Sequence, residues 1–151
     1  MKNLFIIILL TIIYGCGYSS VYKDQKKIDL FINVINSKGD FEINNFIENE
    51  LKIASNINST RKYNVSYETK YEKIILAKDA TGKATDYRLD MNVKFQIISK
   101  NNNEINFGDN FKIKNTSENF EQSNYERDIK RNFSKAARDE LIRSLIKIND
   151  N

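Results

Sequence analysis

KYNVSYETKYEKIIL (62–76) and DYRLDMNVKFQII (86–98) are the two stretches of the sequence that decide its fold. In both, large apolar or aromatic residues alternate with polar ones, and a period of two residues is typical of β-strands. We therefore expect two long strands, each with one buried face and one solvent-facing face. The buried faces are predicted to carry Tyr63, Val65, Tyr67, Thr69 and Tyr71 in the first strand, and Tyr87, Leu89, Met91, Val93, Phe95 and Ile97 in the second.

The segment between these strands, AKDATGKAT (77–85), has the composition of a turn. Asp79 and Thr81 can bond to the nearby backbone, and Gly82 tolerates the positive φ that tight turns require. The two strands are therefore predicted to form an extended antiparallel hairpin.

A strand and a helix are expected before the hairpin. IDLFINVI (28–35) predicts a strand that is apolar, and therefore covered, on both faces, and NSKGD (36–40) is expected to end it. Asp40 or Asn44 can cap the helix that follows. That helix is predicted to pack on one side, because a membrane-surface helix, the alternative, would have a strongly basic polar face. One face of the strand would carry Ile28, Leu30, Ile32 and Val34 and the other Phe31 and Ile35, and the stripe of the helix would comprise Ile43, Phe46, Ile47, Leu51, Ala54 and Ile57.

A fourth strand and a long helix are expected after the hairpin. INFGDNFKI (105–113) predicts the strand, in which Gly108 indicates a bulge or a close backbone approach. The helix is predicted over 122–148. The resulting fold class is α+β, with two helices packed on one face of a four-stranded, mostly antiparallel sheet in the order β-α-β-β-β-α. The predicted buried faces comprise Ile105, Phe107, Phe111 and Ile113 in the strand, and Tyr125, Ile129, Phe133, Ala136, Ala137, Leu141, Leu145 and Ile148 in the helix.

The first residues of the chain have the pattern of a secretory signal. LFIIILLTII (4–13) is an apolar run that is too short for a membrane span, which needs about 20 residues, and suits a signal-peptide core. We expect a signal peptide over 1–15, a tether over 16–27 and a single domain over 28–151.

The only cysteine of the chain, Cys16, lies directly after this run. Ile13-Tyr14-Gly15-Cys16 is similar to a bacterial lipobox, which is cleaved before a cysteine that carries diacylglycerol and further acyl chains such as palmitate. Tyr14 departs from the pattern, because that position is usually small. Lipidation explains a lone thiol, since no second cysteine exists to form a disulfide. The alternatives are an uncleaved anchor and an ordinary signal peptide with an incidental cysteine. Gly17 stands where an aspartate would retain many lipoproteins in the inner membrane, which favours the outer membrane.

Composition excludes several chemistries. The chain of 151 residues contains no histidine, so a Ser-His-Asp triad, a Cys-His pair and a His-bound zinc are excluded. Pairs of carboxylates at strand spacing, such as Asp86 with Asp90 or Glu68 with Glu72, more often mark a solvated face than a glycosidase site. The formal charge is +4 and the lysines are spread along the chain. We expect neither an enzyme nor a nucleic-acid-binding protein.

GCGYSSVY (15–22), DYRLDMNVKFQI (86–97) and NYERDIKRNFSKAARDELIRSLI (124–146) together resemble the LptE family of outer-membrane lipoproteins. The resemblance covers essentially the mature chain. It implies a protein without a cofactor other than the covalent lipid on Cys16, which plugs and helps assemble the β-barrel LptD. It also implies help in the transport of lipopolysaccharide, at the outer membrane and facing the periplasm and the barrel lumen.

Three basic residues are the candidate contacts for lipopolysaccharide. Lys78 and Lys83 flank the predicted turn, and Arg88 follows on the polar face of the strand. Such side chains can donate charge-assisted hydrogen bonds to lipid A phosphates. The alternative for the two lysines is that they keep an exposed loop soluble. The alternative for the whole protein is a stand-alone ligand-binding or structural lipoprotein, which would have an apolar pocket between helices and sheet.

Overall fold

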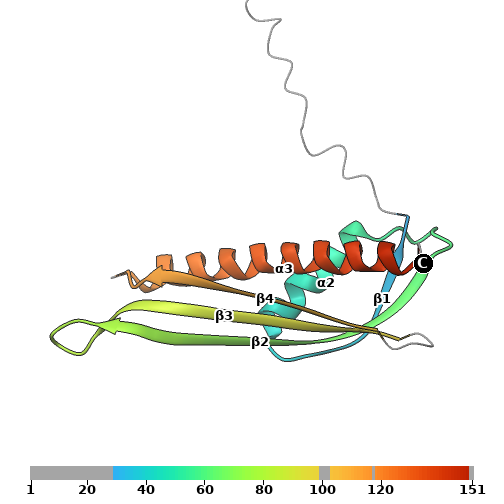
Figure 1. The fold of residues 1–151 in the computed structure, drawn as a ribbon. Helices are drawn as coiled ribbons and strands as arrows, with labels where there is room; N and C mark the ends of the chain where they lie inside the picture. Colours follow the sequence, from blue (N-terminus) through green and yellow to red (C-terminus); the bar gives the residue numbers. More distant parts are fainter. Residues whose placement is uncertain (1–28, 99–102, 117, 150–151) are drawn as a thin grey trace, which may run out of the picture.

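The computed structural model describes residues 29–98, 103–116 and 118–149 (Figure 1). The predicted signal peptide, Cys16, the tether over 16–27 and Ile28 lie outside these residues. The elements are β1 (Phe31–Lys38), α2 (Phe41–Ala54), β2 (Lys62–Lys78), β3 (Ala84–Ile97), β4 (Asn103–Lys114) and α3 (Asn119–Asn149).

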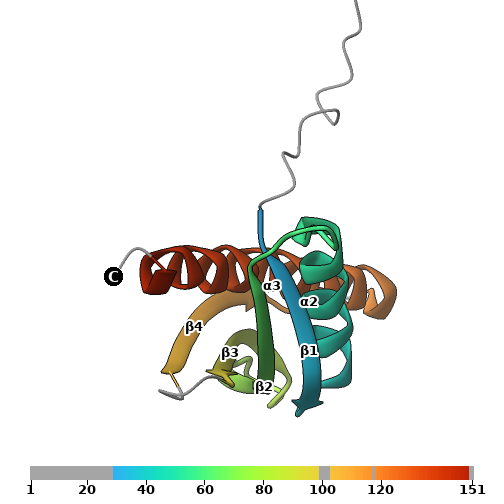
Figure 2. The ribbon, with the colours of Figure 1, turned by 90° about the vertical axis from the view of Figure 1, so that its right-hand side faces the viewer.

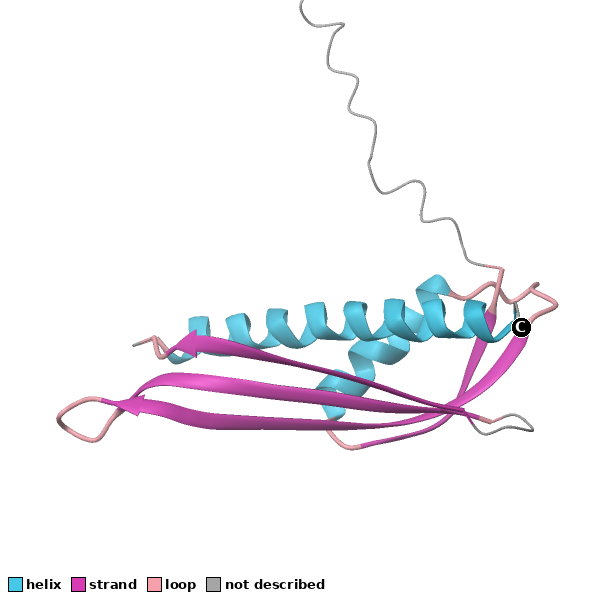
Figure 3. Cartoon of the chain, in the orientation of Figure 1, coloured by secondary structure: helices cyan, strands magenta, loops and turns pink. Residues whose placement is uncertain are grey.

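The four strands form one sheet in the order β1-β2-β3-β4. β1 runs parallel to β2, while β2–β3 and β3–β4 are antiparallel pairs. Both helices cover the same face of this curved sheet, and no other described element lies on the opposite face (Figures 2 and 3). The predicted α+β class and element order are therefore confirmed.

The β2–β3 hairpin follows the predicted alternation. Val65, Leu89, Val93 and Phe95 are fully buried, and they lie among the residues that face the helices. The hairpin is longer than the rest of the sheet, and its closed end lies at the opposite end of the molecule from β1 (Figure 1).

β1 differs from the prediction at its end. The strand continues through Lys38, so NSKGD does not break it. Its register against β2 shifts between Val34 and Asn36, and the extra residue of the bulge, Ile35, is 53% exposed. The prediction that both faces are covered is wrong, because Phe31 lies on the face of the sheet that no described helix covers, and the bulge leaves Ile35 exposed.

α2 begins where Asp40 caps it. The Asp40 carboxylate accepts a hydrogen bond from the Ile43 N–H at 2.9 Å, as an N-cap does. Ile43, Ile47 and Leu51 are buried as predicted. Ile57 is 73% exposed, which corrects the prediction, because the helix ends at Ala54 and its periodicity no longer applies.

β4 pairs with β3 without interruption, so the bulge predicted at Gly108 is absent from this described pair. Gly108 lies opposite Asn92, and a Cβ at Gly108 would lie 2.9 Å from the Asn92 amide nitrogen. The other predicted possibility, a close approach to Gly108, is correct, but the group that approaches is the Asn92 side chain and not a backbone.

α3 starts earlier than predicted. Its buried stripe contains Ile129, Phe133, Ala137, Leu141 and Leu145, and also Ile142, which was not expected. Tyr125, at 54% exposure, and Ile148, at 37%, lie outside the core, contrary to the prediction. Near Tyr125 the inward positions are taken by polar side chains: Gln122 and Lys130 are buried, and Glu126 is half-buried.

Candidate functional site

The face of the sheet opposite the helices, called the open face below, is almost entirely polar. Apolar side chains interrupt it at Phe31, Ile74 and Ile98. By strand register, its polar residues are Lys62, Asn64, Ser66, Glu68, Lys70 and Glu72 on β2, Asp86, Arg88, Asp90, Asn92, Lys94 and Gln96 on β3, Glu104, Asn106, Asn110, Lys112 and Lys114 on β4, and Asn33, Asn36 and Lys38 on β1. Basic and acidic side chains are mixed on this face, so it combines dense hydrogen-bonding capacity with a small positive net charge.

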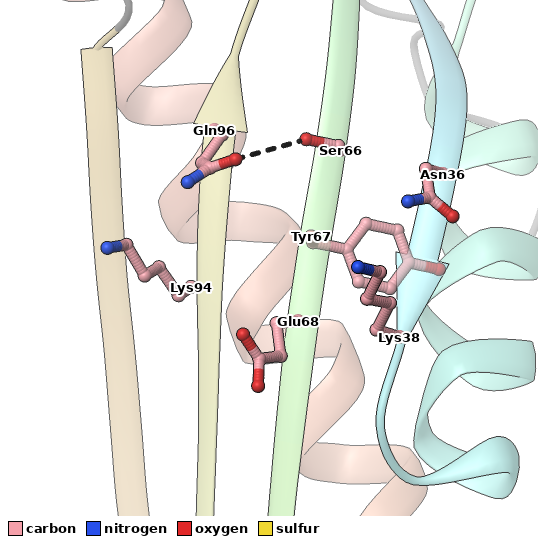
Figure 4. A pocket seen from close by; sticks show the side chains of 7 residues that line it. All are labelled: Asn36, Lys38, Ser66, Tyr67, Glu68, Lys94 and Gln96. Atoms are coloured by element: carbon pink, nitrogen blue, oxygen red, sulfur yellow. Dashed lines mark hydrogen bonds between the residues drawn. The ribbon is translucent and has the colours of Figure 1, made fainter.

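A hollow of about 250 Å³ lies on the open face beside the β1 bulge (Figure 4). The register places Lys38, Glu68 and Lys94 side by side across three strands, and Ser66 donates a hydrogen bond of 3.5 Å to Gln96. Lys94 also pairs with Glu104 at 2.8 Å. The hollow is lined by amides and opposite charges, which suits a polar surface or a hydroxyl-rich ligand better than an apolar one.

Lys78 and Lys83 both lie at the hairpin tip. Asp79 organises the turn: one carboxylate oxygen accepts from the Thr81 N–H at 2.8 Å and from the Lys83 N–H at 3.0 Å. Gly82 supplies the required positive φ of 84°. A hydrogen bond from the Thr81 hydroxyl, followed by those from the Lys83 and Thr81 backbone N–H groups, holds the pKa of Asp79 below its usual value. Both lysines are exposed, and neither forms an ion pair with another described residue.

Arg88 is not part of the tip. It lies four residues after Ala84, the register partner of Lys78, which corresponds to about 13 Å along a strand. Its guanidinium binds the Asp90 carboxylate with two hydrogen bonds of 2.7 and 2.9 Å. The structure therefore brings two of the three predicted residues together, and it gives the third a partner of its own.

Two basic residues that sequence reasoning missed lie beside Arg88. Lys112 of β4 is directly opposite Arg88, and Lys114 is opposite Asp86. Within the described part of the chain, no carboxylate pairs with either lysine. Like charges directly opposite each other on neighbouring strands destabilise a sheet, so the Arg88–Lys112 pair is suited to an anion. The signal was available in FKIK (111–114), where both lysines alternate with buried apolar residues.

A second polar cluster lies between the helices and β2. The Lys130 ammonium contacts Asp40 at 3.2 Å and Glu42 at 3.1 Å. Glu126 accepts hydrogen bonds from Lys73 and from the Tyr71 hydroxyl. Burial and the neighbouring Glu126 raise the pKa of Tyr71 well above its usual value. Burial pushes the pKa of Glu126 up, but the hydrogen bonds from Lys73 and Gln122 outweigh it, so that this pKa lies below its usual value.

This second cluster fits a structural role. Every buried side-chain nitrogen and oxygen of the described residues has a hydrogen-bond partner. The described residues hold no group of three or more acidic, cysteine or histidine side chains placed to bind a metal ion. None of the described helices is both long enough and apolar enough to cross a membrane.

No family model matches the chain, and no curated protein matches it in sequence. Solved structures share its fold. Rare lipoprotein B from Shewanella oneidensis superposes with a TM-score of 0.59 at 13% identity, over 81% of this chain and 96% of that one. A protein described as a lipoprotein, from Caulobacter crescentus, gives a TM-score of 0.55 at 12% identity, over 79% and 90%. The LptE-like fold expected from the sequence is thereby confirmed as a fold.

Proposed function

We propose that this protein is an outer-membrane lipoprotein, anchored through Cys16, that plugs and helps assemble a β-barrel of the LptD type and assists lipopolysaccharide transport. The observation that carries the proposal is the open face, a long, polar and nearly charge-balanced surface on one side of a filled core. The lumen of an outer-membrane barrel presents polar side chains inward. A plug must offer them hydrogen bonds, and the open face does so. Lys112 and Lys114, which have no carboxylate partner among the described residues, would pair with acidic groups of the barrel or with lipopolysaccharide.

The shape of the domain supports this proposal. The described chain begins at the end opposite the hairpin tip (Figure 1). β2 has 17 residues, which corresponds to about 55 Å at the rise of a β-strand. A bilayer with its headgroups is about 40–45 Å thick. A domain tethered at one end inside a barrel would therefore present its hairpin tip near the far membrane surface.

The unpaired cations support a role toward lipopolysaccharide. Lys112 and Lys114 lie on the open face beside Arg88, while Lys78 and Lys83 lie at the tip. Phosphate groups accept charge-assisted hydrogen bonds from lysine and arginine. We expect Lys112 and Lys114 to contribute more than the tip lysines, because they lie two residues apart on one face of a strand, beside Arg88.

The packing of the core favours the plug over a stand-alone ligand-binding lipoprotein. Such a protein would need an apolar pocket between helices and sheet. Ile43, Ile47, Val65, Phe95 and Leu141 fill the middle of that space and are fully buried, and the apolar groove of the described residues lies at its β1 edge. The hollows of the described residues lie on the open face, at the β1 edge and between polar side chains. We also propose that the protein has no enzymatic activity and no cofactor besides its lipid.

Two experiments test the lipoprotein and its role. Labelled palmitate should be incorporated into the wild-type protein and not into Cys16→Ser, and labelling of both would contradict the anchor. Depletion of the protein should lower the amount of folded barrel and of surface lipopolysaccharide. A normal amount of surface lipopolysaccharide after complete depletion would contradict the transport role, even if the palmitate experiment shows that Cys16 carries its lipid.

A further inference from the structure

A groove of about 450 Å³ runs along the free edge of β1, between this strand and α2. Its apolar lining comes from Ile32 and Val34 on β1, Leu51 on α2, and Ile57 in the following loop. At the rim, Glu48 and Lys52 form an ion pair of 2.7 Å, so they leave no net charge. Ile57 is 73% exposed although it borders an apolar surface, which indicates that the groove lacks an occupant.

The free edge of β1 has backbone N–H and C=O groups that can form hydrogen bonds with a further strand. The Phe31 N–H donates to Arg61 on the β2 side, so the backbone groups of Leu30, Ile32 and Val34 point to the free side. The loop after α2 satisfies the first of these groups: the Asn56 N–H donates to the Leu30 carbonyl, and Ser55 Oγ accepts from the Ile32 N–H. The N–H and C=O of Val34 follow the same alternation, and no described loop or side chain bonds them. An extended segment beside an apolar groove would pair with them, as in β-strand addition.

The preceding chain can supply that segment. The described residues begin at Asp29, two residues before β1 and its groove. Residues 17–22, GYSSVY, are uncharged and match the charge-balanced groove, whereas residues 23–27, KDQKK, are charged and suit a loop. The loop is too short for a parallel crossover, which needs about a dozen residues, but long enough for an antiparallel return.

We propose that residues 18–22 add to the free edge of β1 as a short antiparallel strand. Tyr18, Ser20 and Tyr22 would then share one side of the strand, because successive side chains alternate. That side would face the groove, so that both tyrosine rings cover Ile57 and Val34. Each aromatic ring can bury roughly 150–250 Å².

The docked strand has a consequence for the anchor. Cys16 would be held beside the β1 edge instead of at the end of a free tether of 12 residues. The lipid would then fix the side of the domain that approaches the membrane. This inference does not depend on the proposed barrel partner.

Hydrogen exchange of the Val34 amide tests the proposal on the full mature lipoprotein in detergent micelles. We expect this amide to exchange at least about tenfold faster in Tyr18→Ser/Tyr22→Ser than in the wild type. Val21→Ser changes the other side of the segment and is the matched control, so its exchange should stay slow. Equal exchange rates in the wild type and the double variant would overturn the proposal.

A cysteine pair provides a second readout that does not depend on stability. Tyr22→Cys combined with Ile57→Cys should form a disulfide within one molecule, whereas Tyr22→Cys combined with Asn92→Cys on the open face should not. Peptide mass spectrometry identifies the joined residues and excludes Cys16. Equal yields from both pairs would overturn the docking. Disulfides only between molecules would also overturn it, since they would assign the edge to a second copy.

Discussion

The ammonium group of Lys130 lies 4.1 Å from the centre of the Tyr71 ring, while its hydrogen bonds go to Asp40 and Glu42. Lys130 thereby joins α3 to β2 and to the first turn of α2. Only 11% of its side chain is exposed. These contacts therefore lie where solvent screens charges poorly, at the junction of α2, α3 and β2.

Replacing this lysine should destabilise the fold. Lys130→Met keeps the apolar stem but leaves Asp40 without its cation, while Glu42 keeps only its ion pair with Arg127. We expect the free energy of unfolding to fall by about 2 kcal/mol, because half-buried carboxylates lose a charged partner. Urea unfolding measures the change. Lys135→Met on the exposed face of the same helix is the control and should change stability by less than about 0.5 kcal/mol. Equal effects of the two changes would refute the role of Lys130.

Two glycines with positive φ should respond differently to alanine. At Gly39, φ is 103° and an added Cβ would lie 1.8 Å from the Thr69 carbonyl oxygen. At Gly82, φ is 84° and the added Cβ would meet open space. Gly82→Ala should cost only about 1–2 kcal/mol, the strain of the backbone conformation. Gly39→Ala should lower the free energy of unfolding by at least about 3 kcal/mol or prevent folding, because the backbone at Thr69 or at residue 39 must move to make room for the added Cβ. Thermal unfolding of the two variants compares them directly, and similar melting temperatures would contradict the packing at Gly39.

Acid should weaken the contact between α3 and β2. Because the pKa of Glu126 is lowered in the folded protein, its contribution to stability is present above the ordinary pKa of a glutamate. It is lost as the pH falls through the lowered pKa. The stability difference between the wild type and Glu126→Gln should therefore shrink between about pH 6 and pH 3. Glu121→Gln on the exposed side of α3 is the control. A stability difference that stays constant over this range would show that the charge of the Glu126 carboxylate does not stabilise the folded protein.

Alkali should act on the tyrosines of β2. Burial raises the pKa of Tyr67 to about 12, and that of Tyr71 is raised further. Since the folded pKa values exceed the ordinary value of 10, stability from the neutral hydroxyls is complete below about pH 10 and falls as the pH rises through the folded values. Spectrophotometric titration of the folded protein should show two tyrosines that ionise last. Ionisation of all tyrosines together near pH 10 in the folded state would contradict this burial.

The open-face lysines should matter for lipopolysaccharide. Lys112→Gln/Lys114→Gln should weaken binding of purified lipopolysaccharide by about three- to tenfold, because two charge-assisted contacts are lost. Lys135→Gln/Lys147→Gln removes the same charge from α3 and should have little effect. Equal loss in both double variants would indicate that net charge alone governs binding, and that Arg88 and Lys112 form no site.

The sequence predicts those features that follow from local periodicity. The alternation in β2 and β3 specifies the buried face at Val65 and Phe95, and the turn at Asp79 and Gly82 forms as expected. Predictions failed where a neighbouring element decides the outcome. Ile35 is exposed because β1 slips against β2. Tyr125 is exposed because polar residues of α3 take the inward positions, where Glu126 binds Tyr71 and Lys73 of β2.

The candidate site could be predicted only in part for the same reason. Lys78 and Lys83 are close in sequence to the turn that joins them. Lys112 lies beside Arg88 only through the register of β3 against β4, which no local pattern reports. The role of Cys16 stays a prediction from the residues around it.

Purification of the tagged lipoprotein from outer membranes in mild detergent, followed by mass spectrometry, tests the plug most directly. We predict a large β-barrel protein at equal stoichiometry, retained by a Lys78→Gln/Lys83→Gln variant whose open face is intact. Recovery of the lipoprotein alone, in a detergent that keeps other outer-membrane complexes together, would contradict the plug and favour a stand-alone lipoprotein.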